Sequence, residues 1–423
     1  MQESFLHYIW QYKKMAVVNL TTTQFEALDI VSVGQYNTNA GPDFFNAQLK
    51  IGEQLWAGNV EVHIKSSDWF VHNHEIDPAY DNVILHVVWE HDTEIFRKDN
   101  SIIPTLELKQ VVNQGIYKNY VKLMSSQNKW INCESDFGEV DNFVLDHWLE
   151  RLYFERLERK SKTIEGLLID SKNNWEAVLF KMLAKNFGLK VNGDAFFSLA
   201  KSIDYNVIRK IQTDQMLLEA LFFGQAGLLE VDAQDSYYLE LRKAYHFLKQ
   251  KFQLNQGQVL PMQFFRLRPQ NFPTIRLSQL ASLYSSRTHL FSQIIDINTR
   301  KEFYQLFQVG ASSFWDSHYT FGKTSKPSTK KIAKPFIDLL LINTIIPIKF
   351  TYSKFQGKDV NESLLSLIQE IPAEKNNIVS AFNNLRKLSH SAMQSQALVQ
   401  LKTEYCSKNK CLECAVGNAL IVY

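Results

Sequence analysis

The pattern Glu61-Val-His63-Ile-Lys65 constrains the fold of this chain more than any other feature. Successive residues of a β-strand point to opposite faces, so Glu61, His63 and Lys65 would project together from one strand. Asp43 follows a proline in a turn upstream of this strand. Two carboxylates that converge beside a base can hold Mg²⁺ and activate a water for attack on phosphate. The pattern therefore predicts that Asp43, Glu61 and a basic side chain face one cleft on a mixed sheet.

The first part of the chain predicts an α/β domain. Its apolar residues first recur with a helical period and then form β-branched and alternating runs. The expected elements are a helix over 3–14 and strands over 27–36, 45–51, 54–65, 83–90 and 103–109. The segment 66–82 would supply the crossover, and its proline and many polar residues argue against a long helix there.

From about residue 141 the patterns become helical. Helices are expected over 143–160, 174–187, 194–202, 204–222 and 236–252, with helical runs at 278–309 and 332–420. Residues 266–277 are expected to form an irregular basic loop, and 322–331 an exposed basic loop or linker. We therefore divide the chain into an α/β domain at 1–135, a helical domain at 136–322 and a C-terminal helical region with a cysteine cluster at 323–423.

Composition limits the partners of the chain. The net charge is +2, so any nucleic-acid surface must be local. The N-terminus has no long apolar run, which argues against a signal peptide. The longest apolar stretch, 336–348, is short and interrupted by Asn343 and Pro347, so we expect a buried helix and no membrane association. Four cysteines without an export signal predict a reducing cytoplasm.

Several long stretches resemble a bacterial family of unknown function. They read GPDFFNA at 41–47, GNVEVHIKSSDW at 58–69, RPQNFPTIRLSQLA at 268–281 and YCSKNKCLECAVGNAL at 405–420. The stretches are long and specific, so family membership is expected. The resemblance implies no particular activity.

Residues 1–110 also resemble, more remotely, the PD-(D/E)XK nuclease superfamily. The resemblance implies a restriction-endonuclease-like mixed sheet on which an Asp and a Glu bind metal and a basic residue orients water. The catalytic residues that it implies are Asp43, Glu61, His63, Lys65 and Glu3. This chain departs from the superfamily pattern, because His63 stands where the motif has a lysine and Lys65 lies two residues later.

Histidines are frequent around the predicted cleft. His72 and His74 flank one asparagine, and Asp77 follows closely. Imidazole and carboxylate are ligands of transition metals, so these residues are candidates for a zinc site. They are equally candidates for supporting roles in the cleft of Asp43 and Glu61.

The C-terminus carries a second metal signal, Cys406-x4-Cys411-x2-Cys414. Thiolates at this spacing can surround one ion or cluster, and Cys133 is the only other cysteine in the chain. We therefore predict that Cys133 completes a four-sulphur site for Zn²⁺ or an iron–sulphur cluster, which would tie down the chain end. The alternative is four free buried cysteines.

An arginine-rich segment is a candidate nucleic-acid contact. Arg266, Arg268 and Arg276 alternate with prolines and with Phe265 and Phe272. Guanidinium groups and aromatic faces bind phosphates and unstacked bases. The same residues also suit ordinary ion pairs and packing at a rigid turn.

The favoured function is a metal-dependent nuclease that hydrolyses DNA or RNA phosphodiesters with Mg²⁺ or Mn²⁺ at the core site. One alternative is a non-catalytic nucleic-acid-binding or assembly protein on a degenerate nuclease fold. Another is a zinc-dependent hydrolase of a small molecule that uses His63, His72 and His74. The sequence predicts no particular oligomeric state.

Overall fold

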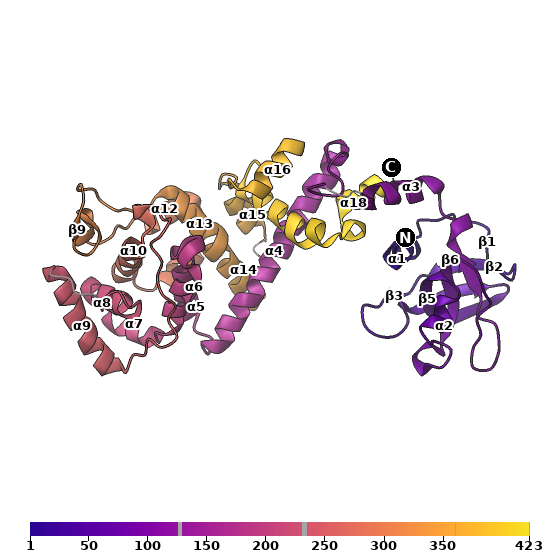
Figure 1. Ribbon diagram of the computed structural model, residues 1–423, viewed down its shortest axis with the longest axis horizontal. Coiled ribbons are helices and arrows are strands. Elements are labelled where there is room, and N and C mark those ends of the chain that lie inside the picture. Colours follow the sequence, from indigo (N-terminus) through magenta and orange to yellow (C-terminus); the bar gives the residue numbers. More distant parts are fainter. Residues whose placement is uncertain (126–128, 231–234, 360, 423) are drawn as a thin grey trace. The chain divides into compact units, whose positions relative to one another are not determined.

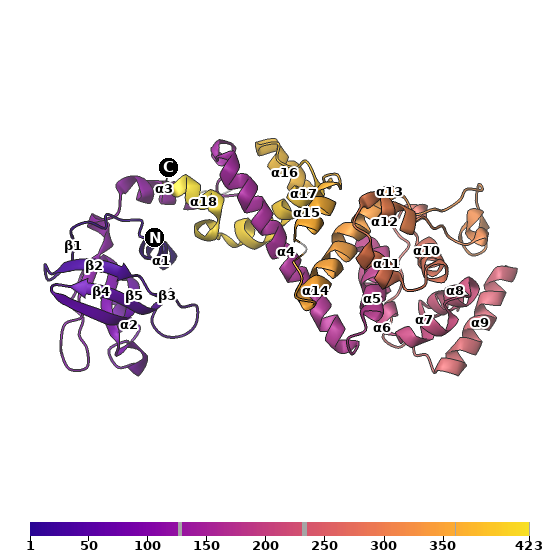
Figure 2. The ribbon, with the colours of Figure 1, turned by 180° about the vertical axis from the view of Figure 1, so that it is seen from behind.

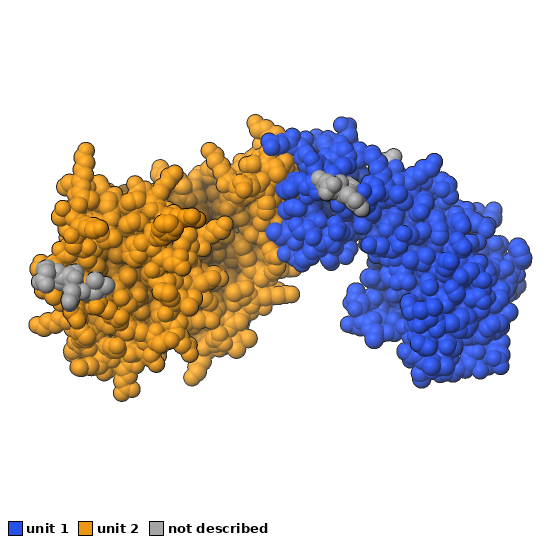
Figure 3. Space-filling model, viewed as in Figure 1, with its two compact units in different colours: residues 1–149, 384–386, 400–423 blue, residues 150–383, 387–399 orange. Residues whose placement is uncertain are grey.

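The computed structural model describes residues 1–125, 129–230, 235–359 and 361–422. The chain divides into two compact units (Figure 3). Unit 1 comprises Met1–Leu149, Asn384–Arg386 and Gln400–Tyr423, and unit 2 comprises Glu150–Asn383 and Lys387–Val399. This division differs from the predicted boundaries, because residues 323–383 belong to the helical unit and the cysteine segment returns to the α/β unit.

Unit 1 is built on a mixed sheet, visible in Figures 1 and 2. Its strands are β1 (Leu20–Thr21), β2 (Ala27–Ser32), β3 (Gln35–Tyr36), β4 (Phe44–Ile51), β5 (Gln54–Lys65), β6 (Val83–Glu90) and β7 (Thr105–Glu107). The strand order is β1-β2-β4-β5-β6-β7, and β3 also pairs with β4. Strands β4 and β5 are antiparallel, whereas β6 is parallel to both β5 and β7. Helix α1 (Glu3–Gln11) packs on β5 and β6.

Glycines determine two turns of this sheet. Gly52 has a φ of +59° and closes the predicted hairpin between β4 and β5. Gly34 has a φ of +89°, and a Cβ there would lie 2.6 Å from the carbonyl oxygen of Phe45. The strand expected over 27–36 is therefore two strands, because the chain turns at Gly34.

The connection from β5 to β6 is short and irregular, as the sequence predicts for 66–82. It contains only the single-turn helix α2 (Asp68–Val71) and the 3-10 turn η1 (Pro78–Tyr80). Trp69 anchors it in a buried cluster with Val83, Ile95 and Ile103. This anchoring holds the residues of the connection over one face of β5 and β6.

The C-terminal segment completes unit 1. Helix α18 (Ala415–Val422) packs on α3 (Gln114–Met124), and Asn119 Nδ2 donates to the carbonyl of Ile421 at 3.3 Å. The remaining turns of this unit are η2 (Leu108–Gln110), η3 (Phe137–Glu139), the π-turn η7 (Leu401–Tyr405), η8 (Cys406–Lys408) and η9 (Cys411–Glu413). The first residues of α4 also belong to unit 1.

Unit 2 is mainly helical, so an N-terminal mixed sheet followed by a helical region is confirmed. Its helices are α4 (Asn142–Asp170), α5 (Trp175–Phe187), α6 (Leu189–Lys201), α7 (Tyr205–Ile211), α8 (Gln215–Gln225), α9 (Ser236–Phe252), α10 (Pro273–Ser286), α11 (Leu290–Asp296), α12 (Arg300–Leu306), α13 (Lys334–Leu340), α14 (Ile346–Phe355), α15 (Asn361–Gln369), α16 (Asn377–Leu385) and α17 (Ala392–Gln400). Shorter elements are η4 (Pro269–Asn271), η5 (Ser313–Asp316), the π-turn η6 (Leu341–Ile345) and the hairpin of β8 (His318–Thr320) and β9 (Lys323–Thr324).

Two predictions for unit 2 need correction. The helix expected over 204–222 is α7 and α8, because the Asp214 side chain caps a new helix by accepting from the N–H of Leu217. The basic loop expected over 266–277 ends earlier, because Pro273 occupies the first turn of α10. Proline favours this position, where a missing N–H costs no hydrogen bond.

One continuous helical stretch, Lys334–Phe355, is long and apolar enough to cross a membrane by length and composition alone. Within unit 2, 67% of its most apolar window is buried. The ammonium of Lys349 on this stretch donates to the carbonyl of Ile295 at 2.7 Å. The packing agrees with the interpretation of residues 336–348 as a core helix.

Candidate functional site

Asp43 and Glu61 meet where β4 begins beside β5. The backbone N–H of Asp43 donates to Glu61 Oε2 at 3.1 Å, and the backbone N–H of Val62 donates to Asp43 Oδ2 at 3.0 Å. Asp43 directly precedes the first residue of β4, and from there its side chain reaches the backbone of the neighbouring strand β5. The structure thus brings together the two acids that the sequence selected.

Glu61 is buried, with 5% of its surface exposed. Burial and the charge of Asp43 raise the pKa of Glu61 to about 9. An ionised carboxylate in such a place is costly without a compensating positive charge. The acid pair therefore has the electrostatic character of a cation site.

Helix α1 contributes two more polar side chains. His7 Nε2 lies 3.1 Å from Asp43 Oδ2, and His7 Nδ1 lies 3.3 Å from the hydroxyl of Tyr36. Burial and the charge of Asp43 raise the pKa of Glu3. Glu3 and His7 are one helical turn apart and share a helix face. Sequence reasoning selected Glu3 but missed His7, which this spacing could have identified.

His63 lies on the same face of β5 as Glu61 and contacts two other histidines. Its Nε2 is 3.0 Å from His72 Nδ1, and its Nδ1 is 2.8 Å from His86 Nε2. His86 is opposite Glu61 in the register of β5 and β6. Burial and the neighbouring imidazoles lower the pKa of His63 to about 3, so its ring is neutral. His86 was absent from the predicted site because its apolar strand favours a core role.

His74 completes the histidine cluster from the connection after β5. Its Nε2 lies 3.5 Å from Glu61 Oε1, as does Nε2 of His63. The His74 ring stacks on Tyr80 with centroids 3.7 Å apart, and Trp69 lies in a T-shaped arrangement with it at 5.4 Å between centroids. Burial lowers the pKa of His74. Aromatic packing therefore fixes this imidazole beside the carboxylate.

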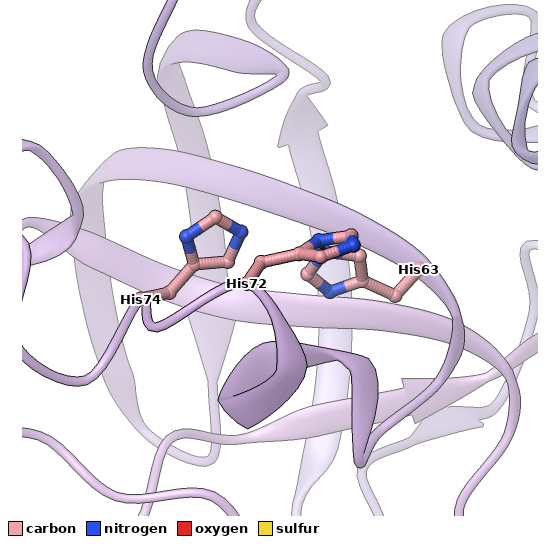
Figure 4. A group of neighbouring side chains, drawn as sticks. All are labelled: His63, His72 and His74. Atoms are coloured by element: carbon pink, nitrogen blue, oxygen red, sulfur yellow. Dashed lines mark hydrogen bonds between the residues drawn. The ribbon is translucent and has the colours of Figure 1, made fainter.

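The three histidines have the spacing of a metal site. One nitrogen from each of His63, His72 and His74 lies within 4.8 Å of the others (Figure 4). A tetrahedral ion with bonds of about 2.1 Å separates its ligands by about 3.4 Å. The 3.5 Å separation of Glu61 Oε1 from two of these imidazoles agrees with that value. Glu61 can therefore serve either the acid pair or a histidine-rich site.

Lys65 and Asp77 occupy other positions. Lys65 is exposed at the end of β5, where its charge acts on Asp92 and its backbone N–H donates to Asp68. The Asp77 side chain caps η1 by accepting from the N–H of Ala79 at 2.9 Å, and the residue reaches His74 through its charge and a backbone hydrogen bond at 3.4 Å. Of the two basic residues proposed beside Glu61, His63 is the one that contacts it.

The four cysteines converge within unit 1. Cys133, Cys406, Cys411 and Cys414 line one small cavity. Cys133 and Cys414 are buried, whereas Cys406 and Cys411 are partly exposed. The structure thus joins the remote cysteine to the C-terminal three.

The three arginines are placed differently from one another. Arg266 and Arg268 are exposed, and the Arg266 guanidinium lies 5.2 Å from the centre of the exposed Phe265 ring. Arg276 is buried in α10, 3.7 Å from the centre of the Phe336 ring, and donates to Gln279 and Asn271. Its inclusion in a nucleic-acid surface is therefore wrong, since the helix that begins at Pro273 turns it inward.

The chain belongs to the family described as "Protein of unknown function (DUF2851)", whose model matches residues 3–377. This assignment confirms the resemblance to a family of unknown function. No match to the chain was found among the curated proteins or the solved structures. Function must therefore be argued from the geometry of the site.

Proposed function

We propose that this member of the DUF2851 family is a metal-dependent nuclease that hydrolyses phosphodiester bonds of DNA or RNA. The observation that carries the proposal is the reciprocal contact of Asp43 and Glu61 between β4 and β5, with His63 on the same strand face. Each carboxylate uses one oxygen to fix its position and can offer the other to a cation. Hard oxygen ligands of this kind suit Mg²⁺ or Mn²⁺.

The strand order supports a restriction-endonuclease-like assignment of unit 1. A helix is followed by three antiparallel strands, a crossover and a parallel strand, which is the order α1-β2-β4-β5-β6. The acid that follows a proline stands at the start of the second strand, and the second acid lies on the third. This is the arrangement that the PD-(D/E)XK resemblance implies.

The chain's own residues would share the chemistry as follows. Asp43 and Glu61 hold the cation, which would polarise the phosphate and lower the pKa of a bound water. The neutral His63, held between His86 at Nδ1 and His72 at Nε2, would help to position that water beside Glu61. His7 orients Asp43, and the charge of nearby Glu3 contributes to the raised pKa of Glu61.

The test is cleavage of DNA and RNA with Mg²⁺ or Mn²⁺ by the natural protein and its Asp43→Asn and Glu61→Gln variants. Loss of a metal-binding carboxylate should reduce the rate by more than about 10²-fold. Asp29→Asn and Glu53→Gln are matched controls, because both acids are exposed, the first on β2 and the second in the turn between β4 and β5. Equal activity in all variants would indicate a contaminating nuclease. No cleavage at all would favour a non-catalytic nucleic-acid-binding or assembly role.

A zinc-dependent hydrolase of a small molecule is the second candidate function. The mutual spacing of His63, His72 and His74 favours it, because imidazole nitrogens prefer zinc over magnesium. Three protein ligands that leave an open position are typical of catalytic zinc. Glu61 would then act beside the ion as a fourth ligand or as a base.

Asp43 and His72 distinguish the two functions. In the nuclease, Asp43→Asn abolishes activity and His72→Gln has a smaller effect. In the zinc hydrolase, His72→Gln removes the metal and Asp43→Asn retains it. Metal content and activity of the two variants, measured together, show which ligand set operates.

A further inference from the structure

The cavity lined by the four cysteines lies apart from the histidine cluster and the proposed nuclease chemistry does not use it. Cys133 comes from the turn before η3, and the other three come from the segment that contains η8 and η9. These two segments are more than 270 residues apart in sequence, yet Asn132 of the first contacts Cys411 of the second. Chance convergence of all four cysteines of a chain on one cavity is improbable without a shared ligand.

The local backbone is shaped to direct the thiols into this cavity. Gly417 lies so close to η9 that a Cβ would stand 2.0 Å from the carbonyl oxygen of Cys411. Asn409 has a left-handed φ of 54°, which turns the chain between Cys406 and Cys411. Asn132 Nδ2 donates to Cys411 Sγ at 3.5 Å. Such donors to sulphur are common around ligating thiolates.

The spacing of the cysteines in the sequence favours an iron–sulphur cluster over a single ion. Cys406-x4-Cys411-x2-Cys414 with one remote cysteine is a spacing at which four thiolates hold such a cluster. Structural zinc sites usually pair their ligands two to four residues apart, whereas Cys133 has no cysteine or histidine that close in sequence.

We propose that Cys133, Cys406, Cys411 and Cys414 bind an iron–sulphur cluster. Its role is structural, because the short segment of η8, η9 and α18 is too small to form a core of its own. Cluster binding would fasten η8, η9 and α18 to the turn before η3. Since η9 also contacts α1, the same fastening supports the helix that carries Glu3 and His7.

The test is anaerobic purification of the full chain, followed by reconstitution with iron and sulphide. We expect iron and acid-labile sulphide in equal amounts and the broad visible absorption of an iron–sulphur cluster. Cys133→Ser and Cys411→Ser should each lower the iron content and increase amide hydrogen exchange in α18. Glu53→Gln is the control, because this acid is exposed and belongs to neither proposed site; it should leave iron, sulphide and exchange unchanged.

Two outcomes would overturn the proposal. One zinc per chain, lost in the cysteine variants, would show a single-ion site. No iron and no sulphide after reconstitution, with unchanged exchange in α18 of the cysteine variants, would show four free thiols. Neither result bears on the acid pair, so the nuclease proposal is tested separately.

Discussion

The backbone N–H of Asp43 donates to the carboxylate of Glu61. The carboxylate of Asp43 in turn accepts from the backbone N–H of Val62, the residue after Glu61. The two hydrogen bonds, at 3.1 and 3.0 Å, form a closed link between the start of β4 and the middle of β5. Side chains that are positioned by backbone groups of adjacent strands need little reorganisation when a ligand binds. This link therefore positions both carboxylates before a ligand binds.

Asp43→Ala should destabilise unit 1 as well as remove a ligand. The change leaves the N–H of Val62 without its acceptor in a partly buried place, which costs about 1–3 kcal/mol. Urea unfolding monitored by fluorescence measures the loss. Asp29→Ala, an exposed acid on β2, should change stability by less than about 0.5 kcal/mol. Equal effects of the two variants would show that the link has no structural value.

His86→Leu should weaken metal binding at the histidine cluster while the protein remains folded. His86 contacts His63 Nδ1 and so directs Nε2 toward the site. Loss of an outer partner of a ligating histidine typically lowers metal affinity by about 10–100-fold. Equilibrium dialysis with Zn²⁺ and Mn²⁺ measures this change. An unchanged affinity for both ions would mean that His63 is not a ligand.

The sequence predicted the sheet well because its signals are local. The alternation in β5, the β-branched run in β6 and the glycine turn at Gly52 each depend on neighbouring residues. The pairing of Asp43 with Glu61 followed from adjacent strands. His7 could have been found from its spacing to Glu3 on α1, whereas His86 could not be ranked from sequence, since it joins the site only through the pairing of β6 with β5. Arg276 was wrongly assigned to the basic loop, because helix α10 already begins at Pro273.

Phe265→Ala should weaken binding of single-stranded nucleic acid. Phe265 is 78% exposed, and Arg266 lies beside its ring, so both can contact a base and its phosphate. Loss of one stacking contact costs about 1–3 kcal/mol, or roughly five- to 150-fold in affinity. Fluorescence anisotropy with a labelled oligonucleotide measures this.

Phe247→Ala is the matched control for this prediction. Phe247 is also exposed, with Lys251 at the same 5.2 Å from its ring centre, but on α9. The control should bind nucleic acid as the natural protein does. Equal losses in both variants would show a non-specific effect of surface aromatic residues.

Gly417→Ala should loosen the C-terminal segment. The new Cβ would collide with the backbone of Cys411, so η9 and α18 must separate. Gly166→Ala is the control, because nothing lies within 4 Å of a Cβ at this position in α4. Alanine there should stabilise the helix by up to about 1 kcal/mol. Limited proteolysis should release the C-terminus in the first variant only; protection in both would exclude the predicted collision.

Glu219 should make the stability of the helical unit depend on pH. Its side chain is fully buried in α8, and burial raises its pKa to about 7. Ser278 donates to Oε1, and Ser312 Oγ donates to Oε2 at 3.1 Å. Ser278 Oγ also accepts from the N–H of Ser312, so its single proton is committed to Glu219.

The sign of this effect follows from proton linkage. Below the unfolded-state pKa, near 4.5, both states carry the proton, and the folded state keeps it up to about pH 7. The free energy of unfolding therefore falls as pH rises through this window, by about 1.4 kcal/mol per unit of pKa difference. Glu219→Gln keeps the shape and an oxygen for Ser278 but cannot titrate. Urea unfolding at pH 5 and pH 8 should show a smaller pH effect in the variant than in the natural protein. Parallel pH profiles would mean that Glu219 is ionised in the folded state and that its two serine donors compensate fully for burial.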